Sequence, residues 1–190
     1  QSTHSADKNS HLRNGQIQHR RFFHKFFSRW NGSDSVYDEA VAAAALSRKT
    51  FGPEALIMVD SYMTWDAAMT LEMSRQLAEY GLYWFEDILS PDKLDAQAAL
   101  RSQVMPVLIA GGEHEFTDRG YLEIARSGAL GLWQPDITWC GGITAGLSIV
   151  ELARQHGIPV VPHRGGEAWG LHLVAATDCE NLAEVLPGNR

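Results

Sequence analysis

Six apolar segments of this 190-residue chain each end in a side chain that can bind a metal ion or move a proton. The end residues follow one another at intervals of 21 to 27 residues and are Asp60, Glu86, Glu113, Asp136, His163 and Glu184. Such an interval fits one strand, one helix and two short loops. The strands of a strand–helix barrel end at one face, where the functional groups of such barrels gather. The spacing therefore predicts six functional groups that converge on one site.

The first three of these residues are carboxylates that end consecutive strands, so Asp60, Glu86 and Glu113 should lie side by side. Three converging carboxylates repel one another and cannot all stay ionised without a cation. A hard divalent ion with oxygen ligands and open water positions is typical of Mg²⁺. One such acid alone would more often be a helix N-cap, but three at nearly equal spacing favour a metal site.

His163 and Asp136 end neighbouring strands and form a second candidate group. The carboxylate could hold the imidazole in one tautomer and raise its basicity, as a general base requires. In isolation, a buried structural histidine would be the favoured interpretation of His163. Beside three metal-binding acids we expect His163 to be the base.

Two further residues are candidates for contact with a substrate. Glu184 could hydrogen-bond a substrate, or it could be only a solvated charge. His114 follows Glu113 directly and could face the metal site or pair with Asp136. A zinc role for His114 is not expected, because no second His or Cys lies nearby at ligand spacing.

Short apolar segments alternate with helical patterns after about residue 50, which is typical of a parallel α/β sheet. Strands are expected at 56–60, 82–86, 107–110, 130–134, 158–162 and 182–186. Helices are expected near 36–49, 65–80, 93–103, 117–127 and 143–156, with a further segment near 167–176 and Thr117 as an N-cap. Residues 20–31 could form a strand, a short helix, or an arm that touches a membrane or nucleic acid. The predicted domains are a polar, disordered segment at 1–20 and an incomplete barrel at 21–190.

The composition argues against several classes of function. The formal charge is −7 and no basic stripe follows residue 30, so nucleic-acid binding is not expected. No apolar segment approaches the ~18 residues that span a bilayer. The two cysteines, Cys140 and Cys179, lie far apart and form no CxxC pair. They favour a reducing, cytoplasmic location without disulfides.

The segments MVDSYMTWD, YWFED, GGEHE, QPDITWCGGIT and VVPHRGG together resemble the enolase superfamily. The resemblance is to its mandelate racemase/muconate lactonizing enzyme-like branch, nearest to acid-sugar dehydratases of the L-rhamnonate dehydratase type. It covers residues from about Phe51 to Glu184. It implies that Asp60, Glu86 and Glu113 bind Mg²⁺. It also implies that Asp136 orients the base His163, and that His114 and Glu184 contact the substrate or intermediate.

The activity implied by this resemblance is that of a hydro-lyase acting on a small-molecule sugar acid. The proton alpha to a carboxylate would be removed with the help of Mg²⁺, and beta-hydroxide would leave to give a 2-keto-3-deoxy acid. A racemase, epimerase or cycloisomerase of the same superfamily is the alternative, as is a truncated fragment without catalytic activity. No lysine pair precedes Asp60, which favours the histidine-based dehydratase.

The resemblance also leaves parts of the family's fold without a match. We recognise neither the family's N-terminal capping domain nor its first barrel strand, although Lys25 could belong to the second strand. The expected fold is therefore a partial (β/α) barrel that lacks the capping domain. An open barrel leaves strand edges unpaired, so we expect low stability unless the chain forms a homo-oligomer.

Overall fold

The computed structural model describes residues 23–177, 179–180 and 182–185. Its centre is a parallel sheet in the order β1–β2–β3–β4–β5. The strands are Phe23–Phe27, Leu56–Asp60, Trp84–Glu86, Leu108–Gly111 and Leu132–Trp133. The predicted parallel α/β sheet is therefore confirmed. The disorder expected for residues 1–20 lies outside the described residues.

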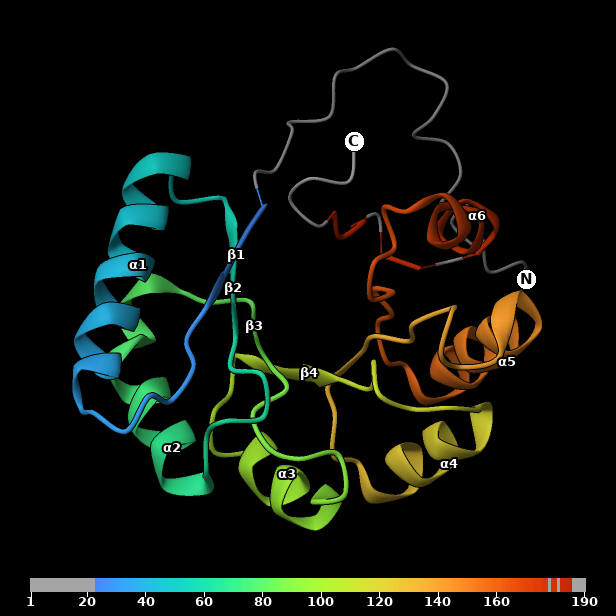
Figure 1. The fold of residues 1–190 in the computed structure, drawn as a ribbon, viewed down its shortest axis with the longest axis horizontal. Coiled ribbons are helices and arrows are strands. Elements are labelled where there is room, and N and C mark those ends of the chain that lie inside the picture. Colours follow the sequence, from blue (N-terminus) through green and yellow to red (C-terminus); the bar gives the residue numbers. More distant parts are fainter. Residues whose placement is uncertain (1–22, 178, 181, 186–190) are drawn as a thin grey trace, which may run out of the picture.

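Helices cover the outer face of this sheet in an incomplete ring that leads from α1 to α6 (Figure 1). They are α1 (Ser35–Phe51), α2 (Ala67–Gln76), the 3₁₀ helix η2 (Ala78–Tyr80), α3 (Leu94–Arg101), α4 (Asp118–Ser127), α5 (Gly142–His156) and α6 (Ala168–Ala176). The described residues thus form a partial (β/α) barrel. None of the helices in this part of the chain is both long and apolar enough to cross a membrane.

Local signals explain where individual helices begin and end. Asp66 caps α2 by accepting a hydrogen bond from the backbone N–H of Met69 at 2.8 Å. Thr117, the predicted N-cap, accepts from the N–H of Arg119 and starts α4. The helix predicted at 65–80 is interrupted: α2 ends at Gln76, and η2 completes the segment before Gly81, whose φ of 58° ends it.

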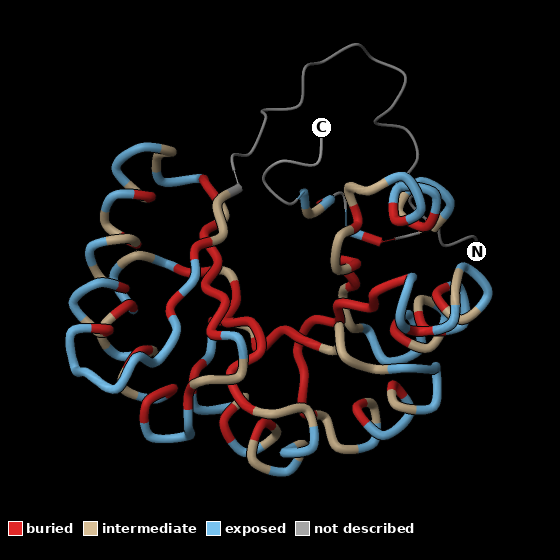
Figure 2. The backbone as a smooth tube through the Cα atoms, viewed as in Figure 1, coloured by how far each residue is buried: buried red, intermediate tan, exposed pale blue. Residues whose placement is uncertain are grey.

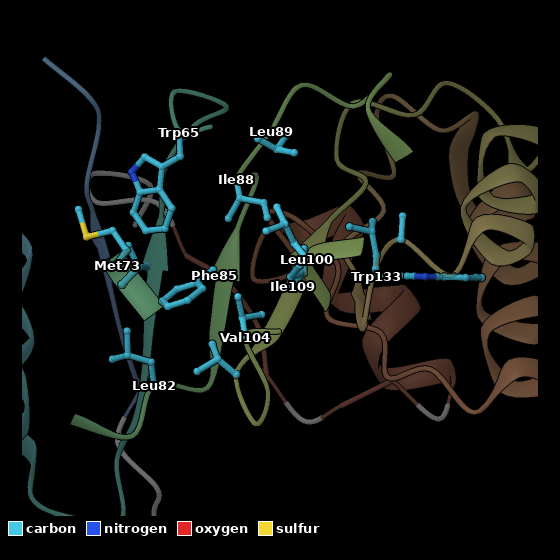
Figure 3. Packing of buried hydrophobic residues seen from close by; sticks show 14 of the residues in the cluster. Trp65, Met73, Leu82, Phe85, Ile88, Leu89, Leu100, Val104, Ile109 and Trp133 are labelled. Carbon is cyan, nitrogen blue, oxygen red and sulfur yellow. The ribbon is translucent and has the colours of Figure 1, made fainter. Parts of the chain in front are cut away.

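Strands β2 to β5 bury both faces, as parallel strands between two apolar layers do, whereas β1 leaves Phe27 exposed. One face contributes Ile57, Phe85 and Ile109 to an outer core shared with the helices, part of which Figure 3 shows. The opposite face forms an inner cluster made of Met58, Trp84, Ala110, Leu132, Val161 and Leu182. Figure 2 shows that burial is concentrated on the strands, while the helices expose their outer surfaces.

The alternation of side chains along a strand decides which acids reach the barrel interior. Asp60 lies two residues after Met58, and Glu86 lies two residues after Trp84, so both share the face of the inner cluster. The register also pairs Lys25 with Met58, which puts Lys25 on that face. Residues 20–31 therefore contain a strand, β1, which runs parallel to β2.

The strands in the second half of the sheet are shorter than the sequence predicts. β5 has two residues instead of the five expected at 130–134, and the segment 158–162 forms only one bridge, between Trp133 and Val160. Pro159 and Pro162 flank that bridge and have no N–H to donate to a ladder.

The strand predicted at 182–186 is wrong for the described residues 182–185, which have no regular secondary structure. Their backbone makes turn and loop contacts instead: the Leu182 N–H donates to the Glu180 carbonyl, and the Glu184 carbonyl accepts from the Gly166 N–H at 2.8 Å. Glu180 in turn donates to the carbonyl of Val160 at 3.0 Å. The segment therefore docks against the loop after Val161 rather than against an extended strand.

Candidate active site

Asp60 and Glu86 are both buried, with exposed fractions of 6% and 0%. The indole Nε1 of Trp84 donates to Glu86 Oε2 at 2.8 Å, because the two side chains lie on the same face of β3. The N–H of Tyr62 donates to Asp60 Oδ1 at 2.9 Å. The two predicted metal ligands on β2 and β3 therefore lie where the sequence predicted, at adjacent strand ends.

Lys25 provides the positive charge on this side of the site. Its Nζ lies 2.7 Å from Glu86 Oε1 and 3.6 Å from Asp60 Oδ2, and it also contacts Glu184 Oε1. Burial alone would lower the pKa of Lys25, but the charges of Glu86 and Glu184 outweigh it and raise that pKa above its ordinary value. Lys25 is therefore held as an ammonium ion that neutralises several acids at once.

The acids nevertheless carry more negative charge than Lys25 can neutralise. Burial, with the neighbouring charge of Asp60, raises the pKa of Glu86 to about 7 despite the opposing effect of Lys25. Burial also raises the pKa of Asp60. Glu113 reaches a pKa of about 8, because it is buried and lies near the charges of Asp87 and Glu86. A divalent cation would relieve this repulsion.

His163 and Asp136 form the pair predicted from the sequence. The imidazole Nδ1 lies 2.8 Å from Asp136 Oδ2. Asp136 is buried, which would raise its pKa, but hydrogen bonds from Thr138 and His163 lower the pKa below its usual value. His163 Nε2 points the other way, 3.3 Å from Glu113 Oε2 and 3.8 Å from Glu184 Oε2. The pair thus faces the acids across the barrel.

His114 faces a different carboxylate from the one that the sequence suggested as its partner. Its Nε2 lies 3.3 Å from Glu113 Oε1 and 3.4 Å from Asp87 Oδ2. Its ring packs edge-on against Trp139 at a centroid distance of 5.7 Å. Of the two placements considered, beside the metal-binding acids or beside Asp136, the geometry supports the first.

Glu184 links the two sides of the site. Its Oε1 contacts Lys25, and its Oε2 accepts from the N–H of Arg164 at 2.9 Å. Burial would raise the pKa of Glu184, but Lys25 and the Arg164 N–H lower it below its usual value. Glu184 is therefore a half-buried, hydrogen-bonded anion rather than a solvated charge.

Among the described residues, the ligand atoms that lie within 4.8 Å of one another come from Asp87, Glu113 and His114. Asp60 and Glu86 lie close enough to Glu113 for their charges to raise its pKa. Lys25 lies between Asp60 and Glu86 and pairs with both. The donor set of carboxylate oxygens suits Mg²⁺. The assignment of Asp60, Glu86 and Glu113 as the ligands remains a prediction.

A cavity of about 280 Å³ adjoins the site between β1 and residues 182–185. It is lined by inner-cluster side chains such as Met58 and Trp84 and reaches Lys25 and Glu184. A small ligand that enters here would meet the ammonium ion of Lys25.

Sequence reasoning missed two residues of this site, Lys25 and Asp87. Lys25 lies in an apolar, aromatic strand, and the alternation of that strand could have pointed it inward with Met58. Asp87 directly follows Glu86, at a position where the sequence predicts only a loop residue. Its left-handed backbone, with φ of 47°, turns its side chain toward His114, and no sequence pattern signals this.

Comparison with known proteins supports the resemblance. The family model described as "Enolase C-terminal domain-like" matches residues 16–190. The similarity therefore begins well before Phe51, and the expectation that residues 1–50 fall outside it is wrong for residues 16–50. The strand β1 with Lys25 belongs to the matched region.

Named relatives and solved structures agree with this match. An L-rhamnonate dehydratase from Saccharopolyspora erythraea is 38% identical over 73% of this chain and 36% of the relative. A D-galactarolactone cycloisomerase from Agrobacterium fabrum is 30% identical over 79% of this chain and 38% of the relative. The crystal structure of rhamnonate dehydratase from Gibberella zeae complexed with Mg has a TM-score of 0.64 and 32% identity, covering 69% of this chain and 32% of that one.

This chain spans about a third of the length of these relatives. The matched range of the family model, residues 16–190, includes the strand–helix region that carries the acids and histidines described above. From its match over residues 16–190 and from these relatives, the chain belongs to the enolase superfamily, as an enolase C-terminal domain-like barrel of the mandelate racemase-like branch.

Proposed function

We propose that this chain is the barrel part of a Mg²⁺-dependent acid-sugar dehydratase. The observation that carries the proposal is the His163–Asp136 pair, whose free nitrogen faces Glu113 at 3.3 Å. In this arrangement a candidate base faces the group of acids across the site. The names of the relatives, L-rhamnonate dehydratase among them, support a sugar acid as the substrate.

Asp60, Glu86 and Glu113 are the proposed Mg²⁺ ligands. Their burial and mutual repulsion fit a divalent cation, and a relative's crystal structure is complexed with Mg. When bound, Mg²⁺ would stabilise the negative charge that develops on the substrate carboxylate as its alpha proton leaves. Without that charge compensation the alpha proton is too weakly acidic to be removed at neutral pH.

His163 would act as the base and then as the acid. Asp136 accepts from Nδ1–H at 2.8 Å, so Nε2 is left with its lone pair toward the substrate. Nε2 takes the alpha proton, the beta C–O bond breaks, and the same proton goes to the departing hydroxide to form water. The enol that remains becomes a 2-keto-3-deoxy acid.

His114 and Glu184 are the proposed substrate contacts, and Lys25 adds a fixed positive charge beside them. Glu184 lies between Lys25 and His163, within 3.8 Å of His163 Nε2. It could accept hydrogen bonds from substrate hydroxyls near the reacting carbon. Lys25 borders the adjoining cavity, where it would attract an anionic substrate.

A racemase of the same superfamily is the second candidate, because Lys25 faces the same site as His163. Racemisation by two bases needs a second neutral group that can accept a proton. Lys25 forms ion pairs with Glu86, Glu184 and Asp60, and the charges of Glu86 and Glu184 raise its pKa, so we assign it as a counter-charge and not as a base. This favours the dehydratase over the racemase.

The proposal is tested by incubating the chain with Mg²⁺ and a panel of aldonic acids and measuring 2-keto-3-deoxy product. Product formation by the parent chain, lost in His163→Asn, supports the proposal. His156→Asn is the matched control, because His156 lies exposed at the end of α5. A silent panel from a chain that still binds Mg²⁺ would support a non-catalytic fragment instead.

A further inference from the structure

The carboxylate that orients the proposed base is itself held by a neighbour on the same loop. Asp136 is 1% exposed, and its Oδ2 lies 2.8 Å from His163 Nδ1. Its other oxygen, Oδ1, accepts two hydrogen bonds from Thr138, one from the backbone N–H and one from the hydroxyl, each at 2.6 Å. The two oxygens of Asp136 therefore have separate partners.

A second acid of the site shows that the hydroxyl is not needed to form such a turn. Asp60 Oδ1 accepts the backbone N–H of Tyr62, again two residues along the chain, at 2.9 Å. Among the described residues, no hydroxyl donates to the Asp60 carboxylate. The bond from the Thr138 hydroxyl to Asp136 is therefore an addition to the turn and not the bond that forms it.

The hydroxyl bond restricts a rotation that the aspartate side chain would otherwise allow. The χ2 torsion of aspartate is broad, so rotamer preference alone does not fix the plane of its carboxylate. A donor bonds best when it lies near that plane, and a short O–H bond to an ionised oxygen is a strong one. The two bonds at Oδ1 therefore define the plane in which Asp136 Oδ2 meets His163 Nδ1.

The position of the proton on the His163 ring is contested in this site. Nδ1–H can donate to Asp136, but Nε2 lies 3.3 Å from Glu113 Oε2, which offers an acceptor to the other tautomer. The first tautomer leaves the lone pair of Nε2 free to accept a proton, and the second does not. A loss of alignment at Asp136 would therefore favour the unproductive tautomer.

We propose that Thr138 is a positioning residue for the base, whose hydroxyl holds the Asp136 carboxylate so that His163 keeps its proton on Nδ1. The influence of Thr138 on the rate rests on the proposed function, because a working enzyme is needed to use the free Nε2. Its influence on the tautomer does not, because the hydroxyl bonds to Asp136 in the chain without substrate.

Two substitutions separate the hydroxyl from the rest of Thr138. Thr138→Val replaces the hydroxyl with a methyl group of similar size and keeps the backbone N–H, whereas Thr138→Ser keeps the hydroxyl. Thr144→Val makes the same change at an exposed threonine of α5 and is the control. Thr138 is also exposed, so all three variants should fold.

Nitrogen-15 NMR of the imidazole rings, recorded in EDTA at a pH where the His163 ring is neutral, reports the tautomer directly. His163→Asn identifies the His163 signals by their loss. We expect a protonated Nδ1 and an unprotonated Nε2 in the parent, in Thr138→Ser and in Thr144→Val. Thr138→Val should shift toward the opposite tautomer. Unchanged His163 signals in Thr138→Val, or a parent chain with its proton on Nε2, would overturn the proposal.

His114 distinguishes positioning from a collapse of the loop. Its ring packs against Trp139 at a centroid distance of 5.7 Å. The N–H groups of Trp139 and Cys140 bond to the Asp136 carbonyl at 3.1 and 2.8 Å. Thr138→Val leaves these bonds in place, so the His114 signals should not move. Changes at both imidazoles would mean that Thr138 supports the loop as a whole, which would contradict the proposal.

Kinetics with an active aldonic acid gives a second readout. Thr138→Val should lower kcat about ten-fold and leave KM within about two-fold of the parent, and Thr138→Ser should restore most of kcat. A rise in KM alone would assign Thr138 to substrate binding and overturn the proposal. If the chain turns over no acid while Thr138→Val still changes the tautomer, the proposed function fails and the positioning role of Thr138 is supported.

Discussion

The two sides of the site handle negative charge differently. On the side of β1 to β3, Asp60 and Glu86 share the ammonium ion of Lys25. On the side beyond β4, Glu113 faces the imidazoles of His114 and His163. Glu184 contacts both sides.

The comparison indicates that one side of the site balances charge and the other side can transfer protons. An ammonium ion whose pKa is raised stays charged at neutral pH, so the lysine side is a fixed electrostatic frame. Histidine as a residue type gains and loses its proton near neutral pH, so the imidazole side is suited to proton transfer. We therefore assign proton transfer to the second side and charge balance to the first, while the proposed Mg²⁺ ligands come from both sides, Asp60 and Glu86 from the first and Glu113 from the second.

The largest expected effect comes from removing the base on the imidazole side. His163→Asn should lower the rate of dehydration by about 10²–10⁴-fold, which is the usual contribution of a general base. Product formation with Mg²⁺ and the active aldonic acid measures it. Asn cannot accept the proton but keeps a donor for Asp136. A variant that retained nearly full activity would show that proton transfer belongs elsewhere.

The next effect is on stability and comes from the lysine side. Lys25→Met should destabilise the Mg²⁺-free chain by up to about 3–5 kcal/mol, because it leaves buried Glu86 without its cation. Urea unfolding measures the loss. Lys93→Met, at an exposed lysine, is the control. An unchanged stability in Lys25→Met would mean that Lys25 does not compensate these acids.

The pH dependence of stability should also report the buried acids. Glu86 has its pKa raised from 4.5 to about 7, and Glu113 has its pKa raised to about 8. In the folded chain these two groups bind protons more tightly than in the unfolded chain, so their contribution to stability is full below pH 4.5 and is lost as pH rises through 7 and 8. Asp136 and Glu184 have lowered pKa values and act in the opposite sense only at lower pH.

Urea unfolding in EDTA between about pH 5 and about pH 8 tests this sign. We expect stability to fall with rising pH, and we expect excess Mg²⁺ to abolish much of the fall. A flat profile in EDTA, or one that rises, would contradict the burial of repelling acids. Glu86→Gln should make the fall shallower.

The smallest effect compares two buried tryptophans. Trp84 donates to Glu86 at 2.8 Å, whereas Trp133 Nε1 has no hydrogen-bond partner among the described residues. Both variants, Trp84→Phe and Trp133→Phe, lose ring volume, but only the first loses a hydrogen bond to a charged group. Trp84→Phe should cost about 1.5–3 kcal/mol more. Equal losses in urea unfolding would show that this bond contributes little.

The sequence predicted strand ends better than strand lengths. Asp60 and Glu86 end β2 and β3 as their intervals predicted, since a strand–helix unit has a characteristic length, whereas Glu184 follows no strand within the described residues. The ladder at Val160 could not be predicted in full, because pairing depends on the N–H groups that Pro159 and Pro162 lack and on what the neighbouring strand offers. The conformation of residues 182–185 depends in turn on the segment around Val160, against which the chain packs.

The site was predicted through its separate strand ends but not through its contacts. His163 and Asp136 pair as expected, because the segments that lead to them run parallel at the bridge between Trp133 and Val160. The partners of His114 and the role of Lys25 depend on a left-handed backbone at Asp87 and on strand register. Both arise from tertiary packing, which local patterns do not encode.

Mg²⁺ binding measured by isothermal titration calorimetry tests the central claim most directly. We expect one Mg²⁺ ion per chain, with binding lost in Glu86→Gln and in Glu113→Gln but kept in Glu54→Gln, an exposed control. Binding that is unchanged in both site variants would contradict the assignment of these acids to magnesium. So would the failure of the folded parent chain to bind the ion at all.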